Sequence, residues 1–400
     1  MSSYQIKQNS QQIIDIIIPV YLDYNCTQKC IKSVLSSRQN YKYQLIVIDD
    51  CSPEPSLSFF LEDLAVDERI KLIKNERNMG FVTSANIGME AHPDRDVVLL
   101  NNDTEVANNW LDRLCRCAQS ESSIGTITPF SNNATICSYP FLCCDNDMPA
   151  GLSTNKMDSL FRQANYGKYV EIPTAVGFCM YIKRCCLNEI GYFDDRAFPT
   201  GYGEENDFCQ RATYKGWRHM LCADTFVYHQ GSKSFGKRKL ELQAVGHQKL
   251  IEMHPNYDNL IADFIARDPL QTLRFAVDIQ RAGLSNTQAL EVVNELGKKL
   301  KLCAEEKMIF YSMERRLRDS IIKYEDALHH AESLLKEKEA EVEAYNKALH
   351  EAQHYVRERE SEISTLNYQI NNLSKNSAHK RLNLKKMLCN TFKSCVDHLK

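Results

Sequence analysis

The stretch DIIIPVYLDYNCTQKCIKSVLSSRQNYKYQLIVIDDCSP, residues 15–53, decides the fold. It holds two continuous apolar and β-branched runs, at 15–20 and 44–49, with a helix-length segment at 24–37 between them. Runs of this kind are typical of strands that are buried on both faces of a parallel sheet. The alternation continues along the chain, with further strands predicted at 70–75 and 96–101 and further helices at 55–67, 81–91 and 107–120.

Repeated strand–helix–strand units predict an α/β fold, with a mostly parallel, Rossmann-like sheet, helices on both of its faces and right-handed crossovers. Ligands of such sheets bind at the carboxyl ends of the strands. The residues that follow the four predicted strands are therefore the first candidates for a binding site: Pro19–Tyr21, Asp49–Asp50, Asn75–Asn78 and Asn101–Asp103.

The chain after residue 130 is less regular. The segment 131–168 is rich in Asn, Ser, Cys, Gly and Pro and is predicted to be a long surface loop. We expect a strand over 170–184, a helix over 204–216 and a short strand that ends at 226–230. These patterns divide the chain into an α/β domain at 13–236, a helical extension at 237–316, a coiled coil at 317–373 and a basic tail at 374–400.

The coiled coil is predicted from an apolar seam that recurs at alternating steps of four and three residues, from Leu317 to Leu373, interrupted by Lys338 and Arg359. About eight such heptads specify a left-handed coiled coil, for which we favour a homodimer or homotrimer. A long amphipathic helix folded back on the α/β domain is the alternative interpretation.

The tail from residue 375 to the end carries seven Lys or Arg residues against one acid, Asp397, with apolar residues interleaved. A basic amphipathic segment of this kind can lie on an anionic membrane surface, which would make the protein peripheral to the membrane. A solvated helical tail and a segment that docks on a partner protein fit the pattern equally well.

The composition, with 43% hydrophobic and 25% charged residues in 400, is that of a globular protein and excludes a wholly disordered or fibrous chain. The net charge of −3 excludes a globally basic nucleic-acid binder. No apolar run approaches the roughly 20 residues that span a bilayer, and the polar N-terminus does not resemble a signal peptide. We therefore expect a cytoplasmic protein whose 16 cysteines stay reduced.

Acidic residues at the strand ends suggest nucleotide and metal chemistry. A carboxylate pair such as Asp49–Asp50 can bind a base or ribose, and a second acidic position, near Asp103, can hold Mg²⁺ or Mn²⁺. Each group by itself equally fits a helix cap. A third cluster, Glu204-Glu205-Asn206-Asp207, equally fits the acidic first turn of a helix. Their occurrence together in one predicted sheet favours a site.

Six motifs resemble the inverting GT-A glycosyltransferases of family 2, in that family's order and spacing. They are DIIIPVY (15–21), IVIDDCSP (46–53), NERNMGFVTSANIGM (75–89), VVLLNNDTEV (97–106), AVGFCMYIKR (175–184) and GYGEENDFCQRA (201–212). The resemblance covers residues 13–236, and the helices to about 285 look like an extension found in bacterial polysaccharide transferases of this group. The coiled coil and the tail are not part of the family pattern.

The resemblance implies a nucleotide-sugar donor site and a divalent cation. The residues that match the family's donor-binding motifs are Pro19, Val20, Tyr21, Asp49, Asp50, Asn78, Gly80, Asn86, Asn101 and Asn102. Asp103 stands at the last position of the family's DxD motif and His229 at its metal-binding histidine, so these two would hold Mg²⁺ or Mn²⁺. The sequence departs from the acidic pattern, because Asn101 and Asn102 fill the other two positions.

The resemblance also implies a catalytic base, a carboxylate that takes the proton of the acceptor hydroxyl as that oxygen attacks C1 of the donor sugar. Glu205 matches this position, and Glu204 and Asp207 are the alternatives. We therefore expect a metal-dependent enzyme that transfers a sugar from a UDP- or dTDP-linked donor, with inversion, to a growing cell-surface polysaccharide or O-antigen. A lipid-linked acceptor would fit such a reaction.

The alternative interpretation is that the domain is non-catalytic. The domain would then bind a sugar nucleotide or glycan without turning it over, and the coiled coil would recruit other transferases. The asparagines in the metal motif are the feature that favours this alternative, because they leave Asp103 as its single carboxylate.

Overall fold

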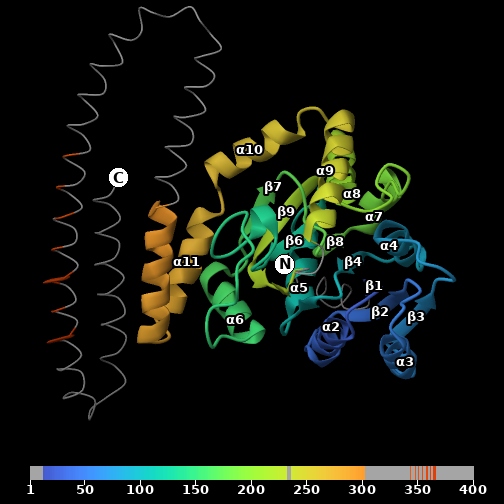
Figure 1. Ribbon diagram of the computed structural model, residues 1–400, viewed down its shortest axis with the longest axis horizontal. Coiled ribbons are helices and arrows are strands. Elements are labelled where there is room, and N and C mark those ends of the chain that lie inside the picture. The colour runs from blue at the N-terminus through green and yellow to red at the C-terminus, as the bar shows by residue number, and fades with distance from the viewer. Residues whose placement is uncertain are drawn as a thin grey trace, which may run out of the picture. The chain divides into compact units, whose positions relative to one another are not determined.

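The computed structural model describes residues 12–231 and 236–301, together with isolated helical residues between 343 and 365 (Figure 1). Met1–Ala304 forms one compact unit and Glu305–Lys400 a second. The predicted coiled coil at 317–373 and tail at 374–400 lie outside the described residues, apart from those isolated positions. Within the described part of the chain, no helix is long and apolar enough to cross a membrane.

The first unit is built on an eight-stranded sheet in which the four strands predicted first are adjacent. In order across the sheet the strands are β3 (Ile70–Lys74), β2 (Lys42–Asp49), β1 (Ile13–Val20), β4 (Val97–Leu100), β8 (Cys179–Ile182), β6 (Ile124–Phe130), β9 (Arg218–Phe226) and β7 (Tyr169–Ile172). The pairs among β3, β2, β1 and β4 and the pair β6–β9 are parallel, whereas β8 and β7 run antiparallel to their neighbours.

Both faces of the sheet are covered, as the continuous apolar runs predict. In β1, Ile16 and Ile18 pack on one face and Ile17 on the other, and all three are fully buried. The helices on the first face are α2 (Tyr24–Ser36), α3 (Pro55–Leu64), α5 (Trp110–Ser120) and α6 (Thr154–Asn165). Those on the second are α4 (Phe81–Glu90), α7 (Arg184–Ile190) and α8 (Glu204–Tyr214). The α/β fold is confirmed.

The prediction of a surface loop at 131–168 is wrong. This segment contains the short 3-10 helix η1 (Thr135–Cys137) and the helix α6, and it buries Tyr139 and Phe161 completely. The Phe161 ring stacks on Phe226 of β9, with ring centres 5.1 Å apart. Because the segment contains many polar residues, its sequence does not indicate that part of it belongs to the core.

Two strand predictions also need correction. The single strand expected over 170–184 is two strands, β7 and β8, separated by residues 173–178. The sequence analysis predicted no strand at 124–130, where β6 lies between β8 and β9. The composition of β6, IGTITPF, explains the omission, because Gly, Thr and Pro interrupt its apolar residues.

Two further features position the site. A small antiparallel ribbon joins β5 (Thr104–Glu105) to β10 (Tyr228–His229). The helical extension follows, with α9 (Gly236–Met253), α10 (Tyr257–Arg267) and α11 (Gln271–Ala282), and with helical residues at 286–301. Its breaks fall at Pro255 and Pro269, as predicted.

Candidate active site

The carboxyl ends of the central strands bring the first predicted residues together. The backbone N–H of Asp50 donates to Val20 O at 2.8 Å, and that of Asn75 donates to Asp49 O at 2.9 Å. The side chains of Pro19 and Val20 are buried, so these two residues offer backbone at this edge, whereas Tyr21 is 40% exposed. This edge of the sheet therefore gathers residues from three of the six motifs.

Asp50 shapes the loop that follows β3. Its Oδ1 accepts from the backbone N–H of Met79 at 2.7 Å, and its Oδ2 accepts from that of Gly80 at 2.9 Å. Asn78 Oδ1 accepts from Gly80 as well, at 3.1 Å, and Gly80 has a positive φ of 83°. Asp49 Oδ1 accepts from the N–H of Ser52 at 2.8 Å. These carboxylates hold the loop geometry of the predicted donor site.

Two of the predicted donor-binding asparagines are committed to other contacts. Asn86 in α4 makes a reciprocal pair with the backbone of Phe193, donating from Nδ2 at 2.9 Å and accepting at Oδ1 at 3.1 Å. Asn102 donates both Nδ2 hydrogens near the start of α2, to Leu22 O at 3.0 Å and to Thr27 Oγ1 at 2.8 Å. Asn101 follows β4, and its backbone N–H donates to Phe178 O at 2.9 Å.

Asp103 and His229 meet across the β5–β10 ribbon. Asp103 Oδ1 lies 3.3 Å from His229 Nε2, and His229 Nδ1 lies 2.6 Å from Asn133 O. Burial acts to raise the pKa of Asp103, but the hydrogen bond and charge of His229 together with backbone hydrogen bonds from Asp103 and Gly231 outweigh it, so this pKa lies below its usual value. The ring of His229 stacks on Phe178, with centres 5.2 Å apart.

The tautomer of His229 follows from these contacts. A carbonyl oxygen only accepts, so Nδ1 must carry the hydrogen that bonds Asn133 O. In the neutral ring Nε2 then points a lone pair at the Asp103 carboxylate, which is favourable only with a proton or a cation between them. The pair therefore fits a divalent cation. The described residues contain no cluster of three or more His, Cys, Asp or Glu side chains placed to hold a metal.

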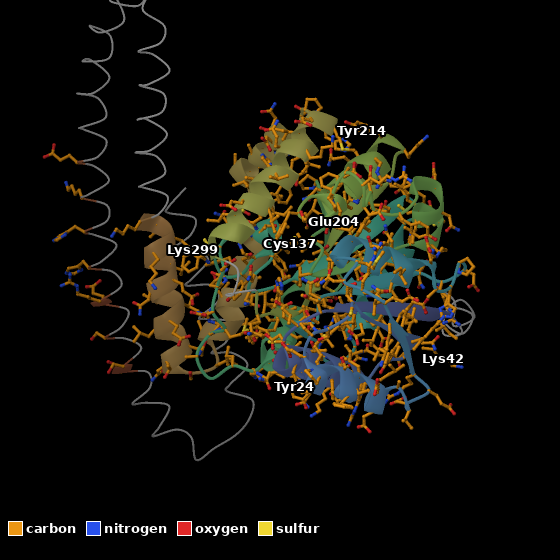
Figure 2. The ribbon with its side chains drawn as sticks, turned by 45° about the vertical axis from the view of Figure 1, so that its right-hand side comes forward. Tyr24, Lys42, Cys137, Glu204, Tyr214 and Lys299 are labelled. Atoms are coloured by element: carbon orange, nitrogen blue, oxygen red, sulfur yellow. The ribbon has the colours of Figure 1, made fainter. Side chains whose placement is uncertain are left out.

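Glu204, which is buried, and Glu205, which is half-buried, open helix α8 and form a pair of adjacent carboxyl groups. Glu204 Oε2 accepts from the N–H of Gly203 at 3.1 Å. Burial, together with the charge of Glu205, raises the pKa of Glu204 well above its usual value, and burial also raises the pKa of Glu205. Glu205 Oε2 is buried without a hydrogen-bond partner in the described part of the chain. Figure 2 labels Glu204 within the body of the domain.

Asp207, the third predicted base, is held on both sides. Its Oδ2 accepts from Arg211 Nε at 2.8 Å, one turn further along α8, and its Oδ1 lies 2.9 Å from His254 Nε2. Asp207 is fully buried. Its contacts are those of a residue that ties α8 to the helical extension.

A short series of contacts connects the two acidic groups. A Cβ placed on Gly177 would lie 3.6 Å from Glu205 Cδ, so Glu205 rests beside the Gly177 backbone. Phe178, the next residue, stacks on His229, which in turn faces Asp103. The predicted base and the predicted metal-binding pair are therefore both next to the two-residue segment 177–178.

The sequence analysis did not identify several residues that support this site. Asn132 pairs with the backbone of His229 through both groups of its amide, each at 2.9 Å, and Asn133 and Phe178 orient the imidazole ring. His254, from the extension, holds Asp207. These residues are separated from their partners by about 50 to 100 positions, so no local spacing signals them.

Comparison with known proteins finds similarity to glycosyltransferases. A family model described as "Glycosyl transferase family 2" matches residues 15–191. The putative teichuronic acid biosynthesis glycosyltransferase TuaG of Bacillus subtilis is 24% identical over 31% of this chain and 48% of its own length. The glycosyltransferase AglE of Haloferax volcanii is 25% identical over 70% of this chain and 89% of its own.

Among solved structures, the mannosyltransferase PcManGT from Pyrobaculum calidifontis, in complex with GDP-Man and Mn²⁺, is similar with a TM-score of 0.46 and 15% identity. The match covers 78% of this chain and 86% of that one. The chain spans less than half the length of the first curated relatives that it matches.

Proposed function

We propose that this chain is a metal-dependent, inverting glycosyltransferase that moves a sugar from a nucleotide-diphosphate donor to a hydroxyl of a growing cell-surface glycan. The observation that carries the proposal is the partnerless buried oxygen of Glu205, next to Gly177, with the Asp103–His229 pair beyond Phe178. A buried polar atom without a partner is rare and requires an explanation. A base that awaits the acceptor hydroxyl provides one.

The donor nucleotide would bind at the carboxyl edge of β1, β2 and β4. Tyr21 offers an exposed ring there, and Asp49, which is itself buried, would bind a ribose hydroxyl or base. Asp50, through its bonds to the 79–80 backbone, would keep the loop closed around the donor. The tight contacts of Asn86 and Asn102 favour structural roles for these two asparagines rather than contact with the donor.

Asp103 and His229 would hold Mg²⁺ or Mn²⁺ together with diphosphate oxygens and water, because the chain offers one carboxylate and one imidazole here. The bound cation would supply positive charge for the departing diphosphate. Asn133 O fixes His229 with Nε2 directed at this place, which is the usual support of a metal-binding histidine.

Glu205 would act as the base. As the acceptor oxygen attacks C1, its proton passes to Glu205, and the bond between C1 and the diphosphate oxygen breaks with the electron pair leaving on the diphosphate. Glu204 has the more strongly raised pKa, so it would keep its proton and leave Glu205 ionised. A raised pKa makes Glu205 a stronger base near neutral pH.

A cell-surface glycan as the acceptor is supported by the similarity to the teichuronic acid biosynthesis glycosyltransferase TuaG of Bacillus subtilis. The predicted coiled coil and basic tail would then bring the enzyme, as an oligomer, to a lipid-linked acceptor at the membrane surface.

The test is a donor screen. UDP-glucose, UDP-galactose, UDP-N-acetylglucosamine, GDP-mannose and dTDP-rhamnose are incubated with the full chain and Mn²⁺, and nucleoside diphosphate release is measured with and without chelator. We expect release with one donor class, its loss with chelator and its loss in Glu205→Gln. Binding of a donor without any release, in the presence of simple sugar acceptors and lipid-linked glycans, would favour the non-catalytic alternative.

A further inference from the structure

Helix α9 of the extension passes against the turn that precedes the carboxyl pair of α8 (Figure 1). The contact is made backbone to backbone at Gly246. A Cβ placed on Gly246 would lie 1.9 Å from Tyr202 O and 3.0 Å from Tyr202 C. No side chain fits in this space, so only glycine allows α9 to approach the turn so closely.

The turn itself has an unusual backbone. Gly201, Tyr202 and Gly203 all have positive φ values, of 81°, 65° and 137°. Tyr202 is the costly member, because a residue with a Cβ rarely adopts this conformation and keeps it only where its surroundings enforce it. The Gly246 contact is one such enforcement, and the packing of Phe198 against Gly203 is a second, since a Cβ on Gly203 would lie 2.8 Å from Phe198 Cε1.

Two more contacts join the extension to the start of α8. His254, just after α9, lies with Nε2 2.9 Å from Asp207 Oδ1, and both side chains are buried. Leu250 of α9 and Tyr257 of α10 pack with Phe198 in a small apolar cluster of their own. The extension therefore contacts α8 directly at Asp207, and it contacts the segment before α8 at the Tyr202 backbone and at Phe198.

We propose that the α9–α10 hairpin is a positioning element of the active site, which holds the first turn of α8 so that Glu205 faces the acceptor. The inference rests on the proposed function, in which Glu205 is the base. Gly246 and His254 are its positioning residues, and neither touches the donor edge of the sheet. The extension is then a working part of the transferase rather than an appended domain.

The principal variant is Gly246→Ala. Its Cβ meets backbone atoms of Tyr202, which cannot rotate away, so either the turn or α9 must shift. We expect kcat to fall about 10- to 100-fold, the range that a misplaced catalytic group costs, while the KM for the donor and the affinity for its nucleoside diphosphate stay within twofold. Gly297→Ala is the matched control, because nothing lies within 4 Å of its Cβ position.

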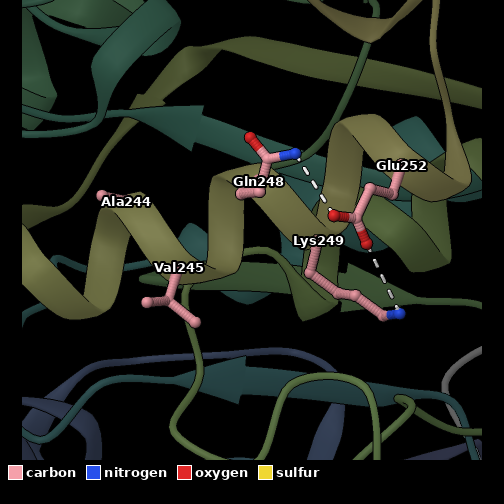
Figure 3. Close-up of a pocket in the computed structure, with 5 residues that line it drawn as sticks. All are labelled: Ala244, Val245, Gln248, Lys249 and Glu252. Carbon is pink, nitrogen blue, oxygen red and sulfur yellow. Dashed lines mark hydrogen bonds and ion pairs between the residues drawn. The ribbon is translucent and has the colours of Figure 1, made fainter.

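A second variant, His254→Asn, keeps the test open should Gly246→Ala fail to fold. It removes the contact with Asp207 without placing bulk against the turn, and we expect the same pattern, a lower kcat with an unchanged donor KM. Val245→Ala is its control, since Val245 lies on the outward face of α9 among the side chains of Figure 3 and is 66% exposed. That control should leave both constants unchanged.

Hydrogen exchange gives a readout that does not depend on turnover. In folded Gly246→Ala and His254→Asn, the amides of 203–207 should exchange faster than in the unsubstituted chain, while those of β2 should not change. Unchanged exchange at 203–207, or a kcat within twofold of the unsubstituted chain, in both folded variants would overturn the positioning role. Absence of turnover by the unsubstituted chain with every donor would instead overturn the proposed function.

Discussion

The carboxyl pair at the start of α8 offers the sharpest test of the proposed chemistry, through two isosteric changes at neighbouring positions. Glu205→Gln removes the proposed base and keeps the shape of the side chain. A positioned general base contributes about 10²- to 10⁴-fold to a rate, which corresponds to about 3 to 5 kcal/mol in the activation barrier. We expect kcat to fall by that factor at pH values above the acid limb, where Glu205 is ionised, with the donor KM little changed.

Glu204→Gln should behave differently, because burial and the charge of Glu205 raise the pKa of Glu204 and so favour its protonated form. A glutamine amide has the shape of the protonated acid, it can still accept the N–H of Gly203, and its NH₂ can still donate toward Glu205. We therefore expect a kcat within about fivefold of the unsubstituted chain and an acid limb of the pH profile that stays in place.

The assay is the initial rate of nucleoside diphosphate release from pH 5 to 9, with thermal unfolding to show that both variants fold. The acid limb should lie above the ordinary glutamate pKa of 4.5, since burial raises the pKa of Glu205. The reasoning is refuted if Glu205→Gln retains more than a tenth of the activity, or if Glu204→Gln loses as much as Glu205→Gln.

Three further outcomes are expected. Burial raises the pKa of Glu204 in the folded chain. The contribution of Glu204 to the free energy of unfolding is therefore complete below pH 4.5 and is lost as pH rises through the raised pKa. Glu204→Gln should raise the urea midpoint at pH 8 and leave it unchanged at pH 4. Asp103→Ala should abolish Mn²⁺-dependent binding of UDP in calorimetry, and unchanged affinity would remove its role as a metal ligand. Phe161→Ala should cost about 3 to 5 kcal/mol in urea unfolding, because its ring is fully buried, and a cost below 1 kcal/mol would contradict the observed packing.

The strands at the centre of the sheet could be predicted because burial on both faces leaves a continuous apolar run. The predicted strand at 44–49 lies within β2, and the predicted strand at 96–101 contains β4. The segment 131–168 could not be predicted in the same way. Its polar side chains, such as Asn132 and Asn146, are satisfied by backbone groups inside the fold, so polarity there does not mean exposure.

The residues of the candidate site also fall into a group that the sequence indicates and a group that it does not. Residues at strand ends and at a helix start, among them Asp103 and Glu205, stand out because the topology of an α/β sheet places such positions at one edge. The residues that orient them do not stand out. Asn133 acts through a backbone carbonyl, Gly246 through the absence of a side chain, and Phe178 through the face of a ring, and none of these properties has a signature in a single sequence.

Asn102 shows how such contacts change the reading of a motif. On the sequence alone, an asparagine at an acidic position of the metal motif favours the interpretation that the domain is non-catalytic. Its amide, however, donates to Leu22 O, an atom that can only accept, and a carboxylate there would face that oxygen at about the same 3.0 Å. Asparagine is therefore the residue that this turn requires, whatever the chemistry beside it.

The consequence is opposite to what a motif comparison suggests. Restoring the acidic pattern with Asn102→Asp should not strengthen Mn²⁺ binding. It should lower the urea midpoint by removing a partly buried hydrogen bond and adding repulsion between two acceptors. Because Asn102 ties the turn that carries Asp103 to the start of α2, activity should fall as well. Tighter Mn²⁺ binding with an unchanged midpoint would show instead that Asn102 is a metal ligand lost by substitution, and the non-catalytic alternative would regain its main support.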